Sequence, residues 1–141
     1  MDPIRLLIQC LTYSGIIPFF LCFILAIQNS PGWLFILLAY GAVIQSFIAG
    51  MHWGISIEVE RSVTALVISI ILAIWAWFSV LLICYPLVAI IMQISGLLAL
   101  FMVDYCIISG DNYPYQFHRL RQHVTLIVII VLIAHIFLLP N

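Results

Sequence analysis

The chain has 141 residues, of which 67% are hydrophobic and 6% are charged. Soluble domains average about 45–50% apolar and about 25% charged residues, so this composition excludes a water-soluble fold. The sequence contains no lysine, and its four arginines are outnumbered by five acidic residues, which gives a formal net charge of -1. Because no basic surface is available to neutralise phosphates, we exclude nucleic acid as a partner.

Five apolar stretches are long enough, or nearly long enough, to cross the hydrocarbon core of a bilayer, which needs about 20 helical residues. They cover about residues 6–27, 33–57, 63–83, 87–108 and 124–139. Turn residues or charges separate them, and the longer break at 110–122 mixes aromatic residues with arginine, as an interfacial helix would. The sequence therefore predicts an all-α protein, a five-helix transmembrane bundle that forms one domain over residues 1–141.

The arginines are distributed unevenly between the two sides of this predicted bundle. With five spans, the N-terminus shares one side of the membrane with the second and fourth loops, and residues 5, 61, 119 and 121 all fall there. The positive-inside rule then places the N-terminus inside and the C-terminus outside. The sequence has neither a signal-peptide cleavage pattern nor a transit-type extension, so we predict a multi-pass protein of a bacterial inner membrane.

The second stretch carries two patterned faces. Small residues recur every four positions and predict a stripe on which a neighbouring helix packs closely: Ala42, Ser46, Gly50 and Gly54. A separate face at helical spacing is more polar and consists of Gln45, Ala49, His52 and Ser56. A helix with several such faces is expected at the centre of the bundle.

The fourth stretch places Gln93, Gly96, Leu100 and Asp104 on one face and runs in the same direction as the second. Counted from the outer ends of the two helices, Asp104 and His52 differ by about two residues, or about 3 Å of depth. We therefore predict that these two side chains can meet. Gln9 of the first span is expected at a similar level, and Arg121 at the cytoplasmic rim.

An aspartate inside a membrane span costs about 2.5–3.5 kcal/mol on insertion scales, so Asp104 is expected to be paired or to face water. Two interpretations follow. The pair with His52 can lock helices together, or it can serve as a proton relay or a ligand site. The candidate polar site consists of His52, Asp104, Arg121, Gln9, Gln45 and Gln93.

Metal and cofactor chemistry find little support in the sequence. Its four cysteines stand singly in apolar runs and read as small hydrophobic residues, so no metal site is predicted. Haem would need two histidines at equal depth, and the one plausible pair, His52 and His123, differs in depth by about a helical turn. We predict no cofactor and no enzyme motif, and keep a quinone at His52 as an alternative.

Three blocks of sequence resemble an uncharacterised domain-of-unknown-function family that includes mitochondrial transmembrane protein 69 and small proteobacterial multi-pass membrane proteins. The blocks are 15–19 (GIIPF), 40–54 (YGAVIQSFIAGMHWG), and Pro114 with Phe117, Leu120, Arg121, Val124 and Thr125. The family usually has Trp-Tyr where this chain has Gln116 and Phe117. The resemblance implies a multi-pass inner-membrane protein whose polar pattern includes His52, Asp104 and Arg121, and it implies no reaction.

These observations favour a non-enzymatic accessory or assembly partner of a larger membrane complex. By analogy with the mitochondrial members, that complex would be a respiratory one. The expected partners are the lipid bilayer, another integral membrane protein, or a second copy of this chain. The alternative hypotheses are a small proton-linked transporter and a quinone-binding protein, both using the His52 and Asp104 site.

Overall fold

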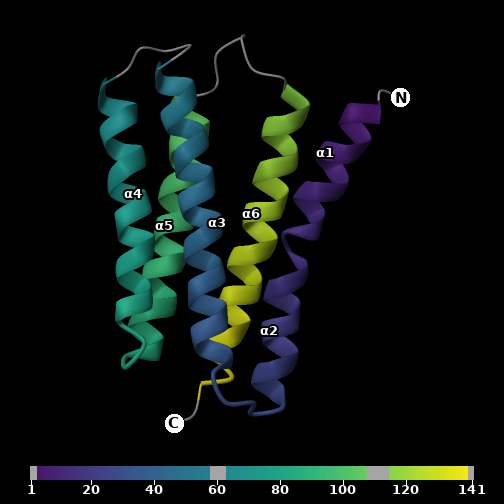
Figure 1. Ribbon diagram of the computed structural model, residues 1–141, viewed down its shortest axis with the longest axis vertical. Helices are drawn as coiled ribbons and strands as arrows, with labels where there is room; N and C mark the ends of the chain where they lie inside the picture. Colours follow the sequence, from purple (N-terminus) through teal and green to yellow (C-terminus); the bar gives the residue numbers. More distant parts are fainter. Residues whose placement is uncertain (1–2, 58–62, 108–114, 140–141) are drawn as a thin grey trace.

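The structure is a computed structural model that describes residues 3–57, 63–107 and 115–139, and these residues contain helices and no strand. The helices are α1 (Pro3–Ser14), α2 (Ile17–Ile27), α3 (Trp33–Ile55), α4 (Val63–Leu81), α5 (Pro86–Ile107) and α6 (Tyr115–Ile136). They stand side by side as an upright bundle with the two chain ends at opposite ends (Figure 1). Among the described residues, five segments are long and apolar enough to cross a membrane, which confirms the predicted five-span all-α bundle.

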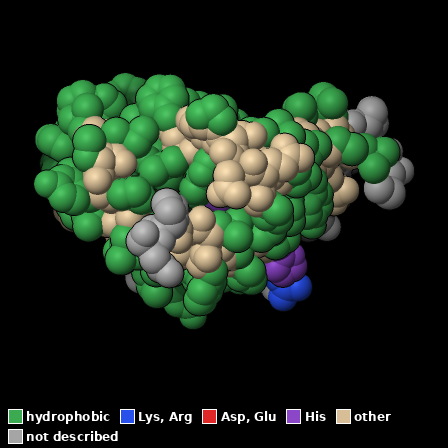
Figure 2. All heavy atoms as spheres, turned by 90° about the horizontal axis from the view of Figure 1, so that it is seen from below, with side chains coloured by type: hydrophobic (Ala, Val, Ile, Leu, Met, Phe, Trp, Pro, Cys, Tyr) green, Lys and Arg blue, Asp and Glu red, His purple; other side chains and the backbone are tan. Residues whose placement is uncertain are grey.

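The outer surface of the bundle is apolar. Large hydrophobic side chains point outward along every helix, among them Phe47 at 67% and Val63 at 76% exposure. Figure 2, seen from below, shows hydrophobic side chains over most of the visible surface. A soluble monomer rarely exposes large contiguous apolar patches, so a surface of this kind is suited to lipid. The protein is therefore a multi-pass membrane protein.

The first predicted span is interrupted between α1 and α2. Pro18 has no backbone N–H, so the carbonyl of Ser14 loses its usual helical partner and the helix breaks at Gly15 and Ile16. The N–H of Phe19 bonds to the carbonyl of Ile16, which also leaves the carbonyl of Gly15 without its helical partner. The hydroxyl of Tyr40 on α3 donates a 3.0 Å hydrogen bond to this carbonyl of Gly15. This bond ties the break to the central helix, while α1 leans away from the bundle (Figure 1).

The central helix is α3, which contacts α2, α4 and α5. Its more polar face is turned inward, with Gln45, Ala49, His52 and Ser56 at most 4% exposed. The matching face of α5, which carries Gln93, Leu100 and Asp104, is also buried. The two faces predicted from helical spacing therefore lie in the interior of the bundle.

Two glutamines lock α3 to α5 in a reciprocal arrangement. The side-chain amide of Gln45 donates a 2.9 Å hydrogen bond to the backbone carbonyl of Gln93, and the amide of Gln93 donates one of 2.6 Å to the carbonyl of Leu38. Each amide lies against a glycine of the opposite helix, where an added Cβ would overlap it: Gln45 over Gly96, and Gln93 over Gly41. These glycines are needed because the amides occupy the space of a side chain.

The predicted small-residue stripe lies elsewhere, on the outer side of α3. Ser46 and Gly50 are exposed, and Ala42 and Gly54 are half-buried. Within the described chain, a Cβ added at Gly50 or Gly54 would meet no atom within 4 Å outside its own stretch of helix. No helix of the described chain therefore packs tightly on these two glycines, and the stripe stays a prediction for contacts with another molecule.

Candidate functional site

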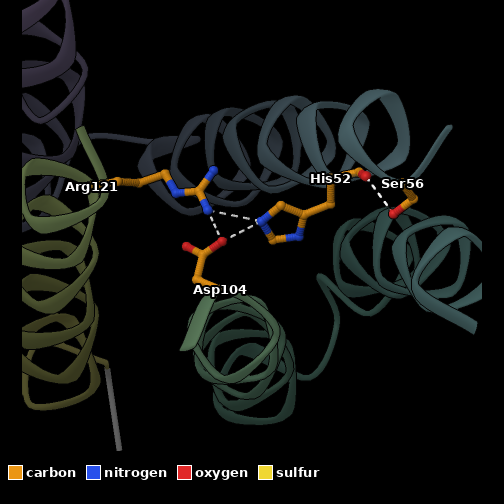
Figure 3. A network of polar contacts seen from close by, with 4 residues as sticks. All are labelled: His52, Ser56, Asp104 and Arg121. Carbon is orange, nitrogen blue, oxygen red and sulfur yellow. Dashed lines mark hydrogen bonds and ion pairs between the residues drawn. The ribbon is translucent and has the colours of Figure 1, made fainter. Parts of the chain in front are cut away.

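Three ionisable side chains meet at the end of the bundle that carries the N-terminus (Figure 3). His52 comes from the last turn of α3, Asp104 from near the end of α5, and Arg121 from near the start of α6. Helices α3 and α5 end here and α6 begins here, which is why residues far apart in sequence share one level. Their exposed fractions are 2%, 3% and 6%, so the cluster is almost wholly buried.

One carboxylate oxygen joins the three residues. Nη2 of Arg121 donates to Oδ1 of Asp104, and Nε2 of His52 contacts the same oxygen. Nη2 of Arg121 also lies 2.9 Å from Nε2 of His52. Nη2 carries two hydrogens, so it can donate to the carboxylate and to a neutral imidazole together. The helix ends are thereby tied to one another by a single polar cluster.

The imidazole of His52 can play either of two roles in this geometry. When neutral, Nε2 accepts from Arg121, and when protonated, it donates to Asp104. With His52 neutral, the charges of Arg121 and Asp104 cancel. The cluster therefore offers Nε2 a partner in either protonation state, Arg121 when His52 is neutral and Asp104 when it is protonated.

The backbone of α3 at this level is held by Ser56. Its buried hydroxyl donates a 2.7 Å hydrogen bond to the carbonyl of His52, one turn earlier. A serine that bonds back to the preceding turn satisfies its own hydroxyl inside an apolar bundle. This bond fixes the backbone of the last turn of α3 and therefore the position of His52.

An apolar groove runs beside the cluster, with a volume of about 380 Å³. One wall is formed by α1 and α2, including Leu11, Thr12 and Phe19, and the other by α3 and α6. Arg121 is the one charged residue among the described residues that line it. Leu11 and Phe47 at the rim are 63% and 67% exposed on the apolar surface, so the groove can be reached from lipid.

The guanidinium of Arg121 has donors that the cluster does not use. Nε and Nη1 are buried and have no hydrogen-bond partner among the described residues. Leaving such a group unsatisfied costs about 1–3 kcal/mol, and more when it is charged. Because Arg121 lines the groove, a ligand there that reaches Nε or Nη1 would supply the missing acceptor.

The other predicted site residues do not join this cluster. Gln45 and Gln93 are buried between α3, α4 and α5, where Gln93 also donates a 3.1 Å bond to Ser79, and neither lines the groove. Gln9 is exposed on α1. Three of the six candidates, His52, Asp104 and Arg121, are thus brought together, and the glutamines serve helix packing or face outward.

Histidines and cysteines form no metal cluster in the part of the chain that the structure describes. His123 is exposed and so does not share the interior with His52. His135 is buried at the other end of the bundle, where its Nδ1 donates to the carbonyl of Val131 and its ring stacks on Trp33. Its observed partners make it a packing residue.

The groove itself was not predicted from the sequence. A signal for its α6 wall existed, because Arg121, Val124, Thr125 and Val128 follow helical spacing and share one face. The opposite wall depends on where α1 stands after the break at Gly15, and periodicity does not give that position.

A comparison with known protein families identifies the family of this chain. A family model described as a protein of unknown function (DUF3429) matches residues 4–137. The chain belongs to this family. The DUF3429 match confirms the resemblance to a domain-of-unknown-function family, and it includes all three residues of the cluster. No curated protein and no solved structure matches the chain.

Proposed function

We propose that this protein binds a lipid-soluble molecule from within the bilayer. The apolar body of that molecule would lie in the groove between α1, α2, α3 and α6, and its polar head would accept hydrogen bonds from Arg121. The observation that carries the proposal is the buried guanidinium at the groove, whose Nε and Nη1 have no partner in the described chain.

The chemistry of the groove supports this proposal. Binding sites for small molecules are mostly apolar and have a few placed polar groups that fix the orientation of the ligand. Here the lining is apolar apart from Arg121 and two threonines, Thr12 and Thr125. An ionisable residue inside a membrane is costly, so it usually has a structural or functional role. Asp104 contacts one of the three guanidinium nitrogens of Arg121, which leaves the other two for a ligand.

Solvent extraction of the purified protein tests the proposal. The protein is isolated from native membranes in mild detergent, and its bound organic molecules are identified and counted by mass spectrometry. We expect about one copy per chain of a lipid-soluble compound that is enriched over the surrounding lipid. Thr12→Trp, which fills the groove, should lose it.

A neighbouring substitution provides the control. Tyr13 is 46% exposed and does not line the groove, so Tyr13→Trp should keep the compound. If wild type and both variants carry only the lipid composition of the membrane, the groove is a lipid-facing crevice and the proposal fails.

The exposed stripe on α3 supports a second candidate, the accessory role in a membrane complex. Ser46 and Gly50 are exposed, and a Cβ at Gly50 or Gly54 meets no described atom within 4 Å outside its own stretch of helix, so the backbone of another transmembrane helix can approach here. Gly50→Leu should abolish co-purification of a stoichiometric membrane partner. Val43→Leu, at an exposed position of α3 outside the stripe, should not. Absence of such a partner from the wild-type preparation would remove this candidate.

A further inference from the structure

We infer that the head of the bound molecule is an uncharged, planar ring with carbonyl oxygens, the chemistry of a quinone, and that it is not an anionic lipid headgroup. This inference rests on the proposed function, because it names the class of ligand for the same groove. It is carried by the charge and donor pattern around Arg121 and by the aromatic residues of the two walls.

The charge of the site disfavours an anion. Arg121 contacts the carboxylate of Asp104, so the positive charge at the groove is already offset. Anionic headgroups are usually bound by clusters of basic residues, and this chain has no lysine and four arginines in all. A further negative charge beside Asp104, in a buried setting, would be left without compensation.

The donors of the site specify an acceptor. Arg121 lines the groove, and its unused polar atoms, Nε and Nη1, are buried N–H donors. Nη2 is held by Asp104 and His52, so a bond from a ligand to Nε or Nη1 would leave the cluster intact. A carbonyl oxygen accepts such bonds without adding charge, whereas a cationic head would be repelled by the guanidinium.

The walls favour a flat ring. Phe47 on α3 and the buried Phe19 on α2 both line the groove, and Met51 lies one turn beyond Phe47. Aromatic faces and methionine sulfur both pack well against conjugated rings. The rest of the lining is aliphatic, which suits the tail of a lipid-soluble quinone.

Three probes with alkyl tails of nine or ten carbons test the inference: a decyl-substituted benzoquinone, decanoate and decylbenzene. Each is added to the full-length protein in nanodiscs of phosphatidylcholine, and the thermal unfolding midpoint is followed as the probe concentration rises. A ligand that binds the folded state raises the midpoint in a saturable way. We expect such a rise with the quinone and none with decanoate or decylbenzene.

Arg121→Lys provides the matched variant, because it keeps a positive charge for Asp104 and removes the guanidinium donors. Its folding is checked by the midpoint without probe, and its affinity for the quinone should fall about tenfold or more. Unchanged affinity in this variant would overturn head recognition by Arg121.

The remaining outcomes separate the two proposals. A saturable rise with decanoate and none with the quinone would overturn this inference and leave the proposed function standing. An equal rise with all three probes would show that the groove recognises only the alkyl tail, which would also overturn this inference. No rise with any probe, together with solvent extracts that do not differ between Thr12→Trp and Tyr13→Trp, would overturn both.

Discussion

Asp104 is the residue on which the polar cluster depends. Its Oδ1 is shared by Arg121 and His52, and all three side chains are buried. Removing one partner of a buried ion pair leaves the other charge uncompensated, which costs about 3–5 kcal/mol. Replacing both partners by apolar residues is often neutral, because the desolvation cost of two charges disappears with them.

Asp104→Asn is therefore expected to lower the free energy of unfolding by about 3–5 kcal/mol, since Arg121 stays charged and loses its counter-ion. The double variant Asp104→Leu with Arg121→Leu should recover most of this loss while abolishing ligand binding. Unfolding by sodium dodecyl sulfate in mixed micelles, followed by circular dichroism, measures the free energy of unfolding of both variants. A double variant less stable than Asp104→Asn would contradict this account.

Residue-level prediction from the sequence succeeded where depth could be counted. Residue positions along two parallel helices placed His52 and Asp104 within about 3 Å of depth, and the structure places them in contact. Arg121 was expected at the cytoplasmic rim, which stays a prediction, and the structure adds that it is buried at 6% exposure. It is buried because α6 begins at Tyr115, so Arg121 lies inside a helix and its long side chain contacts the carboxylate of Asp104.

At the scale of the elements, the break between α1 and α2 shapes the groove. Pro18 interrupts the helix, and the hydroxyl of Tyr40 satisfies the freed carbonyl of Gly15. No water is present in the hydrocarbon core to replace this bond. The position of α1, and hence one wall of the groove, therefore depends in part on a single tyrosine.

Tyr40→Phe should lower the free energy of unfolding by about 1 kcal/mol, the usual contribution of one hydrogen bond, and should weaken ligand binding as α1 loosens. Tyr13→Phe removes a hydroxyl from an exposed tyrosine and should change neither quantity. The same detergent unfolding assay and probe titration apply. Equal effects of the two substitutions would show that the break does not rely on Tyr40.

The reciprocal packing of glutamine on glycine predicts that substitutions at different glycines change the stability by different amounts. Gly96→Ala places a Cβ where the amide of Gln45 lies and should cost about 1–3 kcal/mol, whereas Gly50→Ala meets open space and should be neutral or stabilising. Thermal unfolding of the two variants measures the contrast. A destabilised Gly50→Ala in purified protein would contradict the placement of the stripe.

Patterns along single helices predicted the buried faces of α3 and α5, because helical spacing alone identifies residues that share a face. The same patterns did not identify which neighbour covers each face. The stripe at Ala42, Ser46, Gly50 and Gly54 was expected against a helix, yet the close approaches occur at Gly41 and Gly96. The angles and distances between helix axes decide which face makes the close contacts, and the periodicity of a single helix does not contain them.

At the scale of the whole molecule, five segments that can cross a membrane leave the chain ends at opposite ends of the bundle (Figure 1). Composition and the length of the apolar runs were enough to predict this architecture. From the distribution of arginine we predict an orientation, with the N-terminus inside and the C-terminus outside. The polar cluster would then lie towards the cytoplasmic face.

Alkaline phosphatase fusions test this orientation, because the enzyme is active only outside the cytoplasm. A fusion at the C-terminus and one after Ser30 should be active, and one placed within residues 58–62 should be inactive. The reverse pattern would place the cluster and the groove at the outer face and would contradict the assignment by arginine.

The most direct test of the central claim is a high-resolution electron cryomicroscopy map of the protein in nanodiscs of native lipid, with a rigid antibody fragment bound for alignment. We predict density for an elongated molecule in the groove between α1, α2, α3 and α6, with its polar end within hydrogen-bond distance of Nε or Nη1 of Arg121. A groove filled by disordered lipid, with both nitrogens bonded to protein or water, would contradict the claim.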